Sequence, residues 1–306
     1  MALQALHDLP APAKLNLFLH VVGRRADGFH LLQSVFVMID WADTLHLERR
    51  TDGQLQRHDL SAALPADDLC LRAARLLQQA SGTALGADIH IDKQVPWGAG
   101  MGGGSSDAAT TLLALNRLWG LHWPRARLAE LGLQLGADVP FFLGGRNAFV
   151  QGIGERLTPL QVPATHYAVV KPPAAIATPD IFSHPLLVRN TEPVILMGSF
   201  DGTGATPWPA EWAAATGQAS FGRNDLQPPA EERCAQVAQA ARWLEARYGN
   251  SRMTGSGSAV FAAANGGTGT ASPPKATFPA DELPPGWVGR LCQGLDEHPL
   301  RGWAAD

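Results

Sequence analysis

The sequence predicts an α+β fold, and three observations lead to this class. Segments in which apolar and polar residues alternate, as in strands, are mixed with segments whose apolar residues recur at helical spacing, without strict strand–helix alternation. The chain has 306 residues, which is long enough for two domains. Its composition, 45% hydrophobic and 17% charged, is typical of a globular protein with a sizeable core and excludes a disordered chain.

Alternation predicts the strands. Over residues 14–22 it sets Leu15 and Val21 on a buried face and Lys14 and Asn16 on the opposite one. This strand therefore presents a cation and an amide together. Two more strands are predicted at residues 34–41 and 44–48, joined by a turn near residues 40–43, and others at 88–92, 147–150, 167–171 and, as a pair, within 251–264.

Helical spacing and capping residues predict the helices. One begins at Asp67 or Asp68 and carries its apolar stripe to Ala80, and Pro124 suits the first turn of another that ends near Gly136. The longest helical pattern covers residues 230–248. Segments rich in Gly and Pro predict a turn at 178–180, a loop at 196–217 and an exposed insertion at 266–286.

The run VPWGAGMGGGSSD at residues 95–107 carries the clearest chemical signal. Glycine has no Cβ, so such a run lets backbone N–H groups approach an anion closely. Ser105, Ser106 and Asp107 make a good helix start, and apolar residues at helical spacing follow as far as Trp119. A helix N-terminus attracts phosphate, so the run predicts a nucleotide-phosphate cradle rather than a flexible linker.

Two better-known glycine loops are excluded. Gly98, Gly100 and Gly103 match the dinucleotide fingerprint, but no acidic residue lies between Asp107 and Glu130 to bind a ribose. A Walker loop is excluded because glycine stands at position 104, where that loop needs its lysine.

Three residues are candidates for phosphoryl-transfer chemistry. Ser106 is interpreted either as a Mg²⁺ ligand or as a helix cap, and both readings stay open. Asp138 is either a turn residue or a base, and Lys14 is either a solvated lysine or its partner. A Lys–Asp pair makes chemical sense, because the ammonium keeps the carboxylate ionised to accept a hydroxyl proton. The polar segment 24–30 is either a turn or a substrate loop, in which Phe29 stacks and His30 hydrogen bonds.

Charge and cysteine usage limit the partners and the compartment. A net charge of −4 argues against nucleic acid, and the chain lacks an 18-residue apolar run and a signal-peptide pattern. Cys70, Cys234 and Cys292 are too scattered for a metal or redox motif. We therefore expect free thiols in a cytoplasmic protein without membrane or nucleic-acid partners, as a monomer or homodimer.

Five segments together resemble the GHMP small-molecule kinases. The glycine run alone indicates only this superfamily, whereas AKLNL and ADGFH are more specific and resemble the 4-diphosphocytidyl-2-C-methyl-D-erythritol kinases. The match covers about residues 11–264. In order, the segments are PAKLNLFL (12–19), RADGFH (25–30), the glycine run, LGADVP (135–140) and MTGSG (253–257).

The resemblance implies two domains, 1–153 and 154–306. The first would be like the second domain of ribosomal protein S5, with ATP over its glycine loop, and the second would be ferredoxin-like. The implied reaction uses ATP and Mg²⁺ to phosphorylate the 2-hydroxyl of the cytidyl sugar alcohol. Homoserine or mevalonate kinases and a non-catalytic nucleotide sensor are the alternatives; a sensor need not keep both Lys14 and Asp138.

Residue roles follow from the same motifs. Asp138 would be the base and Lys14 its partner, and Phe29 and Phe182 would sandwich the cytosine while His30 reads its edge. The implied nucleotide-binding residues are Pro96, Gly98, Gly100, Gly102, Gly103, Gly104, Ser105, Ser106 and Lys93, with Ser106 also the metal ligand. Asn16, Phe29, His30, Thr178, Phe182 and Gly255 are the implied substrate-binding residues. Two positions depart from the pattern: Phe29 is often Tyr, and Met101 is commonly Leu.

Overall fold

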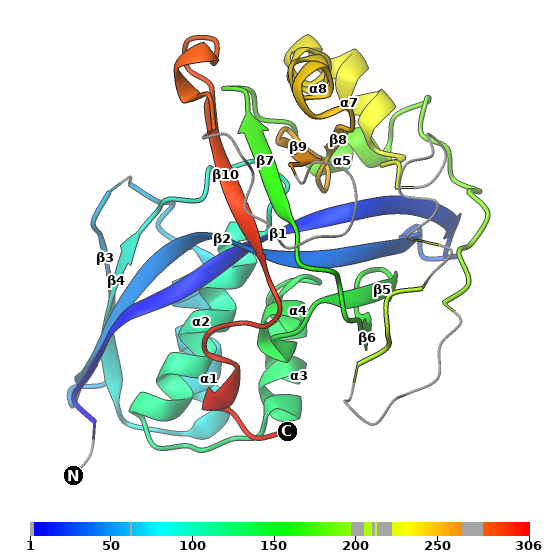
Figure 1. Ribbon diagram of the computed structural model, residues 1–306. Coiled ribbons are helices and arrows are strands. Elements are labelled where there is room, and N and C mark those ends of the chain that lie inside the picture. Colours follow the sequence, from blue (N-terminus) through cyan, green and yellow to red (C-terminus); the bar gives the residue numbers. More distant parts are fainter. Residues whose placement is uncertain (1–2, 62, 197–204, 210–211, 213–221, 265–277) are drawn as a thin grey trace.

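The computed structural model describes residues 3–61, 63–196, 205–209, 212, 222–264 and 278–306. These residues form a ten-stranded sheet that is covered by helices (Figure 1). Strands and helices are mixed along the chain, as predicted for an α+β fold.

Two long strands form the frame of the molecule. β1 (Ala5–Arg24) and β2 (His30–Arg50) pair antiparallel over nearly their whole length. The strand predicted at 14–22 is confirmed and extends at both ends. The turn predicted near residues 40–43 is wrong, because Asp43 lies within β2, paired with Ala11, and its buried carboxylate binds backbone N–H groups instead of capping a turn.

Four shorter strands extend this frame. β4 (Gly86–Asp92) pairs antiparallel with β2 and parallel with β3 (Leu55–Asp59). β5 (Ala148–Gly152) pairs with β2 and with β6 (Arg156–Pro159). The strands predicted at 88–92 and 147–150 are therefore confirmed, with ends shifted by one or two residues.

Four helices pack together on one side of β1 and β2 (Figure 1). α1 (Leu69–Ser81) begins after Asp68, whose carboxylate accepts a hydrogen bond from the Leu71 amide, as the capping pattern predicted. The helix predicted after Pro124 is α3 (Arg125–Leu135), and α4 (Val139–Gly144) follows it. No helix in the described part of the chain is long and apolar enough to cross a membrane.

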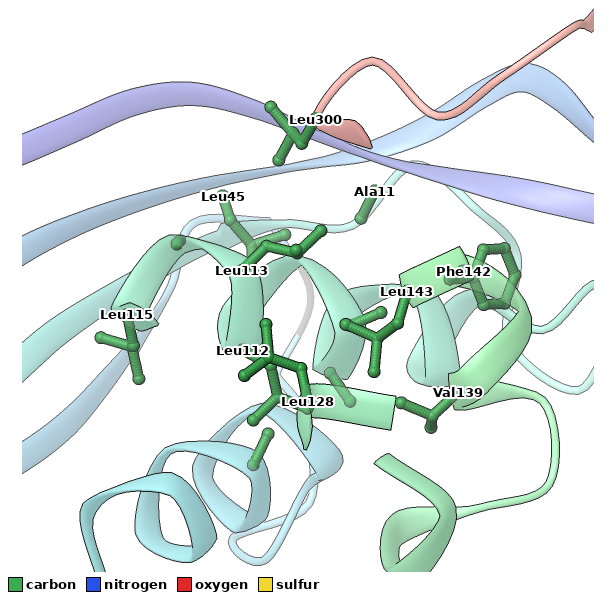
Figure 2. Close-up of a cluster of buried hydrophobic side chains, with 14 of the residues drawn as sticks. Ala11, Leu45, Leu112, Leu113, Leu115, Leu128, Val139, Phe142, Leu143 and Leu300 are labelled. Carbon is green, nitrogen blue, oxygen red and sulfur yellow. The ribbon is translucent and has the colours of Figure 1, made fainter. Parts of the chain in front are cut away.

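The helix after the glycine run, α2 (Gly103–Leu118), begins two residues before the predicted start. Its N-cap is Gly102, and no side chain caps it. Figure 2 shows Leu112 and Leu113 of α2 within a cluster that also holds Leu128, Leu143 and Leu300. Each such fully buried side chain contributes about 1.5–3 kcal/mol, so this core holds the helix that carries the glycine run.

The remaining strands form the second half of the sheet. In chain order they are β7 (His166–Lys171), β8 (Arg252–Met253), β9 (Val260–Ala263) and β10 (Val288–Leu295). They lie in the order β10-β7-β9-β8, with every neighbouring pair antiparallel. This arrangement fits the ferredoxin-like half that the resemblance implied. The strands predicted at 167–171 and within 251–264 are confirmed.

The helical pattern at 230–248 is not one helix. α7 (Gln227–Arg233) and α8 (Ala235–Tyr248) are separated by Cys234, whose extended backbone (φ −144°, ψ 97°) breaks the helical hydrogen bonding. The segment predicted as a turn at 178–180 opens α5 (Thr178–Phe182). Much of the loop predicted at 196–217 and of the insertion predicted at 266–286 lies outside the described residues; within 278–286 there is a short 3₁₀ helix, η1 (Ala280–Glu282).

β10 joins the two halves of the sheet. It pairs with β7 along its length and with β2 through Gly294 and Leu295. The chain then returns to the first half, where η2 (Arg301–Trp303) follows Leu300 and Ala304 joins the core of α2. The domain boundary at 153/154 stays a prediction.

Arg125 holds residues 301–304 against the first half of the molecule, and its replacement tests how much this contact stabilises the fold. Its guanidinium donates hydrogen bonds to the carbonyls of Leu143 (2.6 Å), Arg301 (2.6 Å) and Ala304 (2.7 Å). Arg125→Met leaves three carbonyls without their donor, so we expect the free energy of unfolding to fall by about 2–4 kcal/mol in urea titrations. Arg72→Met, on the exposed side of α1, is the matched control and should leave the midpoint nearly unchanged.

Candidate active site

Two cavities meet at the glycine run. The larger, of about 380 Å³, lies against residues 95–105. The smaller, of about 250 Å³, contains Lys14, Asn16 and Asp138 in its wall. Gly100 and Gly102 line both cavities, so a ligand in one reaches the other across these two glycines.

Most of the predicted site residues line one of these cavities. Those on the larger cavity are Pro96, Gly98, Gly100, Gly102, Gly103, Gly104, Ser105 and Lys93. Those on the smaller are Lys14, Asn16, Asp138, Thr178, Phe182 and Gly255, together with Gly100 and Gly102. Ser106, Phe29 and His30 are not among the described lining residues of either cavity.

The turn at residues 254–259 holds the glycine run in place. The amides of Ser258 and Ala259 donate to the carbonyls of Gly98 and Ala99 at 3.0 and 3.1 Å. Gly100 (φ +73°) and Gly255 (φ +55°) approach each other so closely that a Cβ on Gly255 would lie 2.6 Å from the Gly100 carbonyl oxygen. Only glycine fits at these two positions, because a side chain would both clash and strain the backbone.

Ser106 lies in the first turn of α2 and is fully buried. Its hydroxyl oxygen has no hydrogen-bond partner among the described residues, and neither has Asp107 Oδ1 beside it. Gly102 is the N-cap, so the helix-cap interpretation of Ser106 is wrong. A buried hydroxyl without a partner is costly, and a bound ligand or ion would satisfy it.

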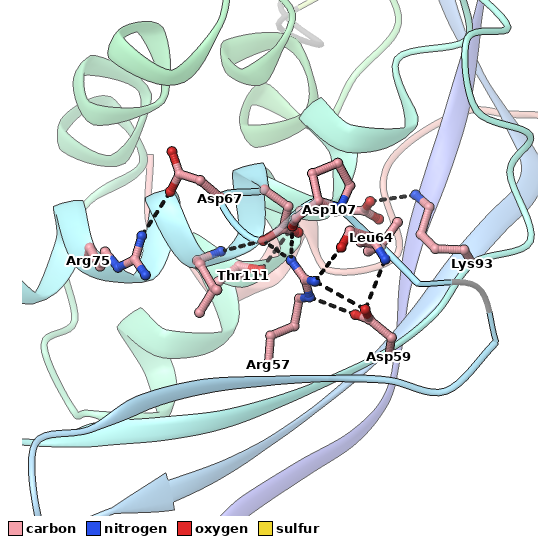
Figure 3. Close-up of polar contacts among 11 residues, drawn as sticks. Arg57, Asp59, Leu64, Asp67, Arg75, Lys93, Asp107 and Thr111 are labelled. Atoms are coloured by element: carbon pink, nitrogen blue, oxygen red, sulfur yellow. Dashed lines mark hydrogen bonds and ion pairs between the residues drawn. The ribbon is translucent and has the colours of Figure 1, made fainter.

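Lys93 forms the wall behind the glycine run. Its ammonium lies between the carboxylates of Asp43 and Asp107, at 2.6 Å from Asp107 Oδ2. Figure 3 shows the contact with Asp107. Burial opposes the charge, but the two carboxylates outweigh it and raise the pKa of Lys93. Asp43 also accepts hydrogen bonds from the amides of Gln94 (2.6 Å) and Val95 (2.7 Å), so this ion cluster fixes the start of the glycine run.

Part of the wall of the larger cavity comes from residues 64–69, a segment without a recognisable motif. Arg57 donates hydrogen bonds to the carbonyls of Leu64 (3.1 Å) and Pro65 (2.8 Å) and is ion-paired with Asp59 and Asp68. Figure 3 shows Arg57 with Leu64 and Asp59. The ring of Trp97 also lines the cavity and is 74% exposed. Sequence analysis missed both the segment at Leu64 and Trp97 as parts of the site. Neither the fold of that segment nor the exposure of a Trp can be predicted from the local sequence pattern.

Lys14 and Asp138 converge in the smaller cavity. Lys14 comes from β1 and Asp138 directly precedes α4, and their Nζ and Oδ2 atoms lie 3.7 Å apart. The lysine side chain is only 4% exposed, whereas that of Asp138 is 31% exposed. Burial lowers the pKa of Lys14, and the charge of Asp138 partly opposes this shift. The ammonium therefore lies behind the carboxylate, which faces the cavity.

Asn16 organises this pair from within the protein. Its Oδ1 accepts hydrogen bonds from Lys14 Nζ (2.6 Å), from the Gly255 amide (2.9 Å) and from Thr254 Oγ1 (3.2 Å), and its Nδ2 donates to Ser34 Oγ (2.9 Å). Asn16 is buried, so only its remaining N–H can serve a ligand.

The outer end of the smaller cavity is formed by α5 and β2. Thr178 Oγ1 lies 2.7 Å from Ser256 Oγ, which links α5 to the 254–259 turn. The ring of His30 stacks on that of Phe182, with centroids 5.0 Å apart and planes at 27°. Phe29 is 59% exposed. The structure thus brings His30 and Phe182 together and leaves Phe29 facing solvent.

Comparisons with known proteins agree with this geometry. Residues 68–146 match the model of the GHMP kinases N terminal domain, and residues 211–271 that of the GHMP kinases C terminal. A solved structure described as 4-(cytidine 5'-diphospho)-2C-methyl-D-erythritol kinase superposes with a TM-score of 0.74 at 33% identity, over 94% of this chain and 99% of that one. A homoserine kinase from Cytophaga hutchinsonii, at 17% identity with a TM-score of 0.63 over 97% of this chain and 96% of that one, shares the fold.

Two curated relatives are similar over almost the entire chain. The 4-diphosphocytidyl-2-C-methyl-D-erythritol kinase of Methylibium petroleiphilum is 64% identical over 99% of this chain and all of that one. The protein of the same name from Paracidovorax citrulli is 55% identical over 99% of both chains. The resemblance found in the motifs is thereby confirmed, and the chain belongs to the 4-diphosphocytidyl-2-C-methyl-D-erythritol kinase family of GHMP kinases.

Proposed function

We propose that this protein transfers the γ-phosphoryl group of ATP to the 2-hydroxyl of 4-diphosphocytidyl-2-C-methyl-D-erythritol, a step of non-mevalonate isoprenoid precursor synthesis. One observation carries the proposal. The Lys14–Asp138 pair lies in a cavity that meets the glycine-run cavity at Gly100 and Gly102. An acceptor beside Asp138 would therefore face the terminal phosphate of a nucleotide held by the glycine run.

The transfer uses few protein groups. ATP occupies the larger cavity, where backbone N–H groups of residues 98–104 and the N-terminus of α2 bind its phosphates. The acceptor hydroxyl oxygen attacks the γ-phosphorus, and the bond from that phosphorus to the β-phosphate oxygen breaks, which releases ADP. Asp138 accepts the hydroxyl proton, and the ammonium of Lys14 lies 3.7 Å from the carboxylate that receives it.

Mg²⁺ fits the unpartnered hydroxyl of Ser106, which would hold it beside the phosphates. The described parts of the chain contain no cluster of three or more His, Cys, Asp or Glu suited to a metal. Phosphate and water oxygens would therefore have to supply the other ligands. When bound, Mg²⁺ supplies positive charge that offsets the charge of the phosphates.

The cytidyl end of the acceptor is assigned to the outer end of the smaller cavity. Phe182 and Phe29 offer rings for stacking the base, and His30 offers a hydrogen bond to its edge. Thr178 lies between this end and the phosphates.

The buried free thiols of Cys70 and Cys292 support a reducing, cytoplasmic location.

A coupled assay of ADP release tests the proposed function. We expect ADP release with the cytidyl substrate and none with homoserine or mevalonate. Turnover of homoserine or mevalonate alone would identify a sister kinase. Calorimetric ATP binding without turnover of any of the three would identify a nucleotide sensor.

Replacing Asp138 tests the base. Asp138→Asn keeps the shape of the side chain but cannot accept the proton, so we expect kcat to fall by roughly 10²–10⁴ with little change in the KM for ATP. Asp52→Asn, an exposed carboxylate on the surface, is the matched control. A kcat like that of the unaltered protein in Asp138→Asn would reject the assigned role.

Replacing Lys14 separates function from stability. Lys14→Met should lower kcat by about 10²-fold or more, without lowering the free energy of unfolding in urea, because the buried charge is removed and the partly exposed Asp138 stays solvated. The same variant tests the pH dependence of stability. The pKa of Lys14 is lowered on folding, so the unfolded chain binds the Lys14 proton more tightly than the folded protein does. The free energy of unfolding of the unaltered protein therefore rises with pH between the folded and the unfolded pKa of Lys14, in the alkaline range, and Lys14→Met should lose this rise. A clearly less stable variant would contradict the account.

A further inference from the structure

A guanidinium lies behind the proposed base-recognition residue His30. Arg189 follows α5, and its Nη atoms donate hydrogen bonds to the carbonyls of Phe182 (2.9 Å), His184 (3.0 Å) and Leu187 (3.0 Å). Its Nε donates to His30 Nε2 at 3.2 Å. Three backbone carbonyls therefore orient the guanidinium, and with it the N–H that points at His30.

This contact decides which nitrogen of His30 carries the proton. An arginine has only donors and stays protonated, so the hydrogen in the Arg189–His30 bond belongs to Arg189 and His30 Nε2 must accept it. A neutral imidazole that accepts at Nε2 carries its own proton on Nδ1. No described residue hydrogen bonds to His30 Nδ1, so this N–H is free to donate to a ligand.

The charged form of His30 is disfavoured at the same place. Burial lowers the pKa of His30, and the positive charges of Arg189 and Arg24 lower it further. His30 is thus neutral at neutral pH and presents a single, defined donor.

The stacking of His30 on Phe182 sets how its Nδ1–H would meet a base that also stacks on Phe182. His30 is nearly parallel to Phe182, at 27°. Two rings that stack on the same face of a third ring lie roughly in one plane, so their edges meet. Cytosine has a lone pair at N3, whereas uracil has a hydrogen there. An Nδ1–H donor therefore matches cytosine, and it would oppose the N–H of uracil and leave both donors unsatisfied.

We propose that Arg189 is the positioning residue that makes this site select cytosine over uracil, because it holds His30 as an Nδ1–H donor. The inference rests on the proposed function for the identity of the substrate. Its structural part, the proton position on His30, is independent of any activity.

Nitrogen NMR of the full-length, unaltered protein tests the structural part. The ¹⁵N shifts of His30 at pH 7, assigned by the signals lost in His30→Gln, should show a protonated Nδ1 and an accepting Nε2. The reverse tautomer, or an imidazolium at this pH, would overturn the inference even if the Arg189 variants failed to fold.

Substrate selection tests the functional part. We expect the unaltered protein to prefer the cytidyl substrate over its uridyl analogue in kcat/KM, and Arg189→Leu to reduce this ratio by about tenfold or more. Arg189→Lys, which keeps a charged donor, should restore part of it. The control Arg72→Leu, which replaces an exposed arginine on α1, should leave the tautomer and the ratio unchanged.

The outcomes separate the two proposals. If the unaltered protein turns over neither nucleotide substrate, the proposed function fails, and the NMR result alone decides whether Arg189 sets the tautomer. If the unaltered protein selects the cytidyl substrate and folded Arg189→Leu keeps the same ratio, the role of Arg189 is wrong while the function stands.

Discussion

The buried ammonium of Lys14 is the constraint around which the site is built. Its Nζ contacts Asn16 Oδ1 and Asp138 and lies 4.4 Å from the centroid of the Phe36 ring, while its backbone amide donates to the Met101 carbonyl in the glycine run. A buried charge is costly unless several groups compensate it. One residue of β1 thus fixes the acceptor cavity and the phosphate loop relative to each other.

Two other cations, Lys93 and Arg189, support the site in the same way as Lys14. Lys93 lies behind the start of the glycine run between two carboxylates, and Arg189 lies behind His30 against three backbone carbonyls. In each case the protein holds the cation, and the cation supports a group that the proposed function uses. Because these supports are buried or hydrogen bonded to the backbone, the supported groups are oriented before a ligand arrives, which lowers the cost of ordering them.

The sequence pattern predicted those features of the structure that depend on interactions between near neighbours in the chain. The Asp68 cap, the alternation in β1 and the glycine run all depend on neighbours in the chain, and each was visible in the sequence. The misassigned turn at Asp43 shows the limit, because its carboxylate accepts hydrogen bonds from Lys93 and the amides of Gln94 and Val95, about fifty residues away. Arg189 has no motif at all, since its role depends on a contact 159 residues apart in the chain. Which residues converge could be inferred only from the resemblance, and why they converge only from the packing.

The pKa of Lys14, measured by NMR of its side chain in the full-length protein, tests the central claim most directly. The account predicts a pKa below that of a free lysine, because burial outweighs the attraction of Asp138, and a further decrease in Asp138→Asn, because that attraction is then lost. A pKa at or above the ordinary lysine value that does not respond to the loss of Asp138 would contradict it.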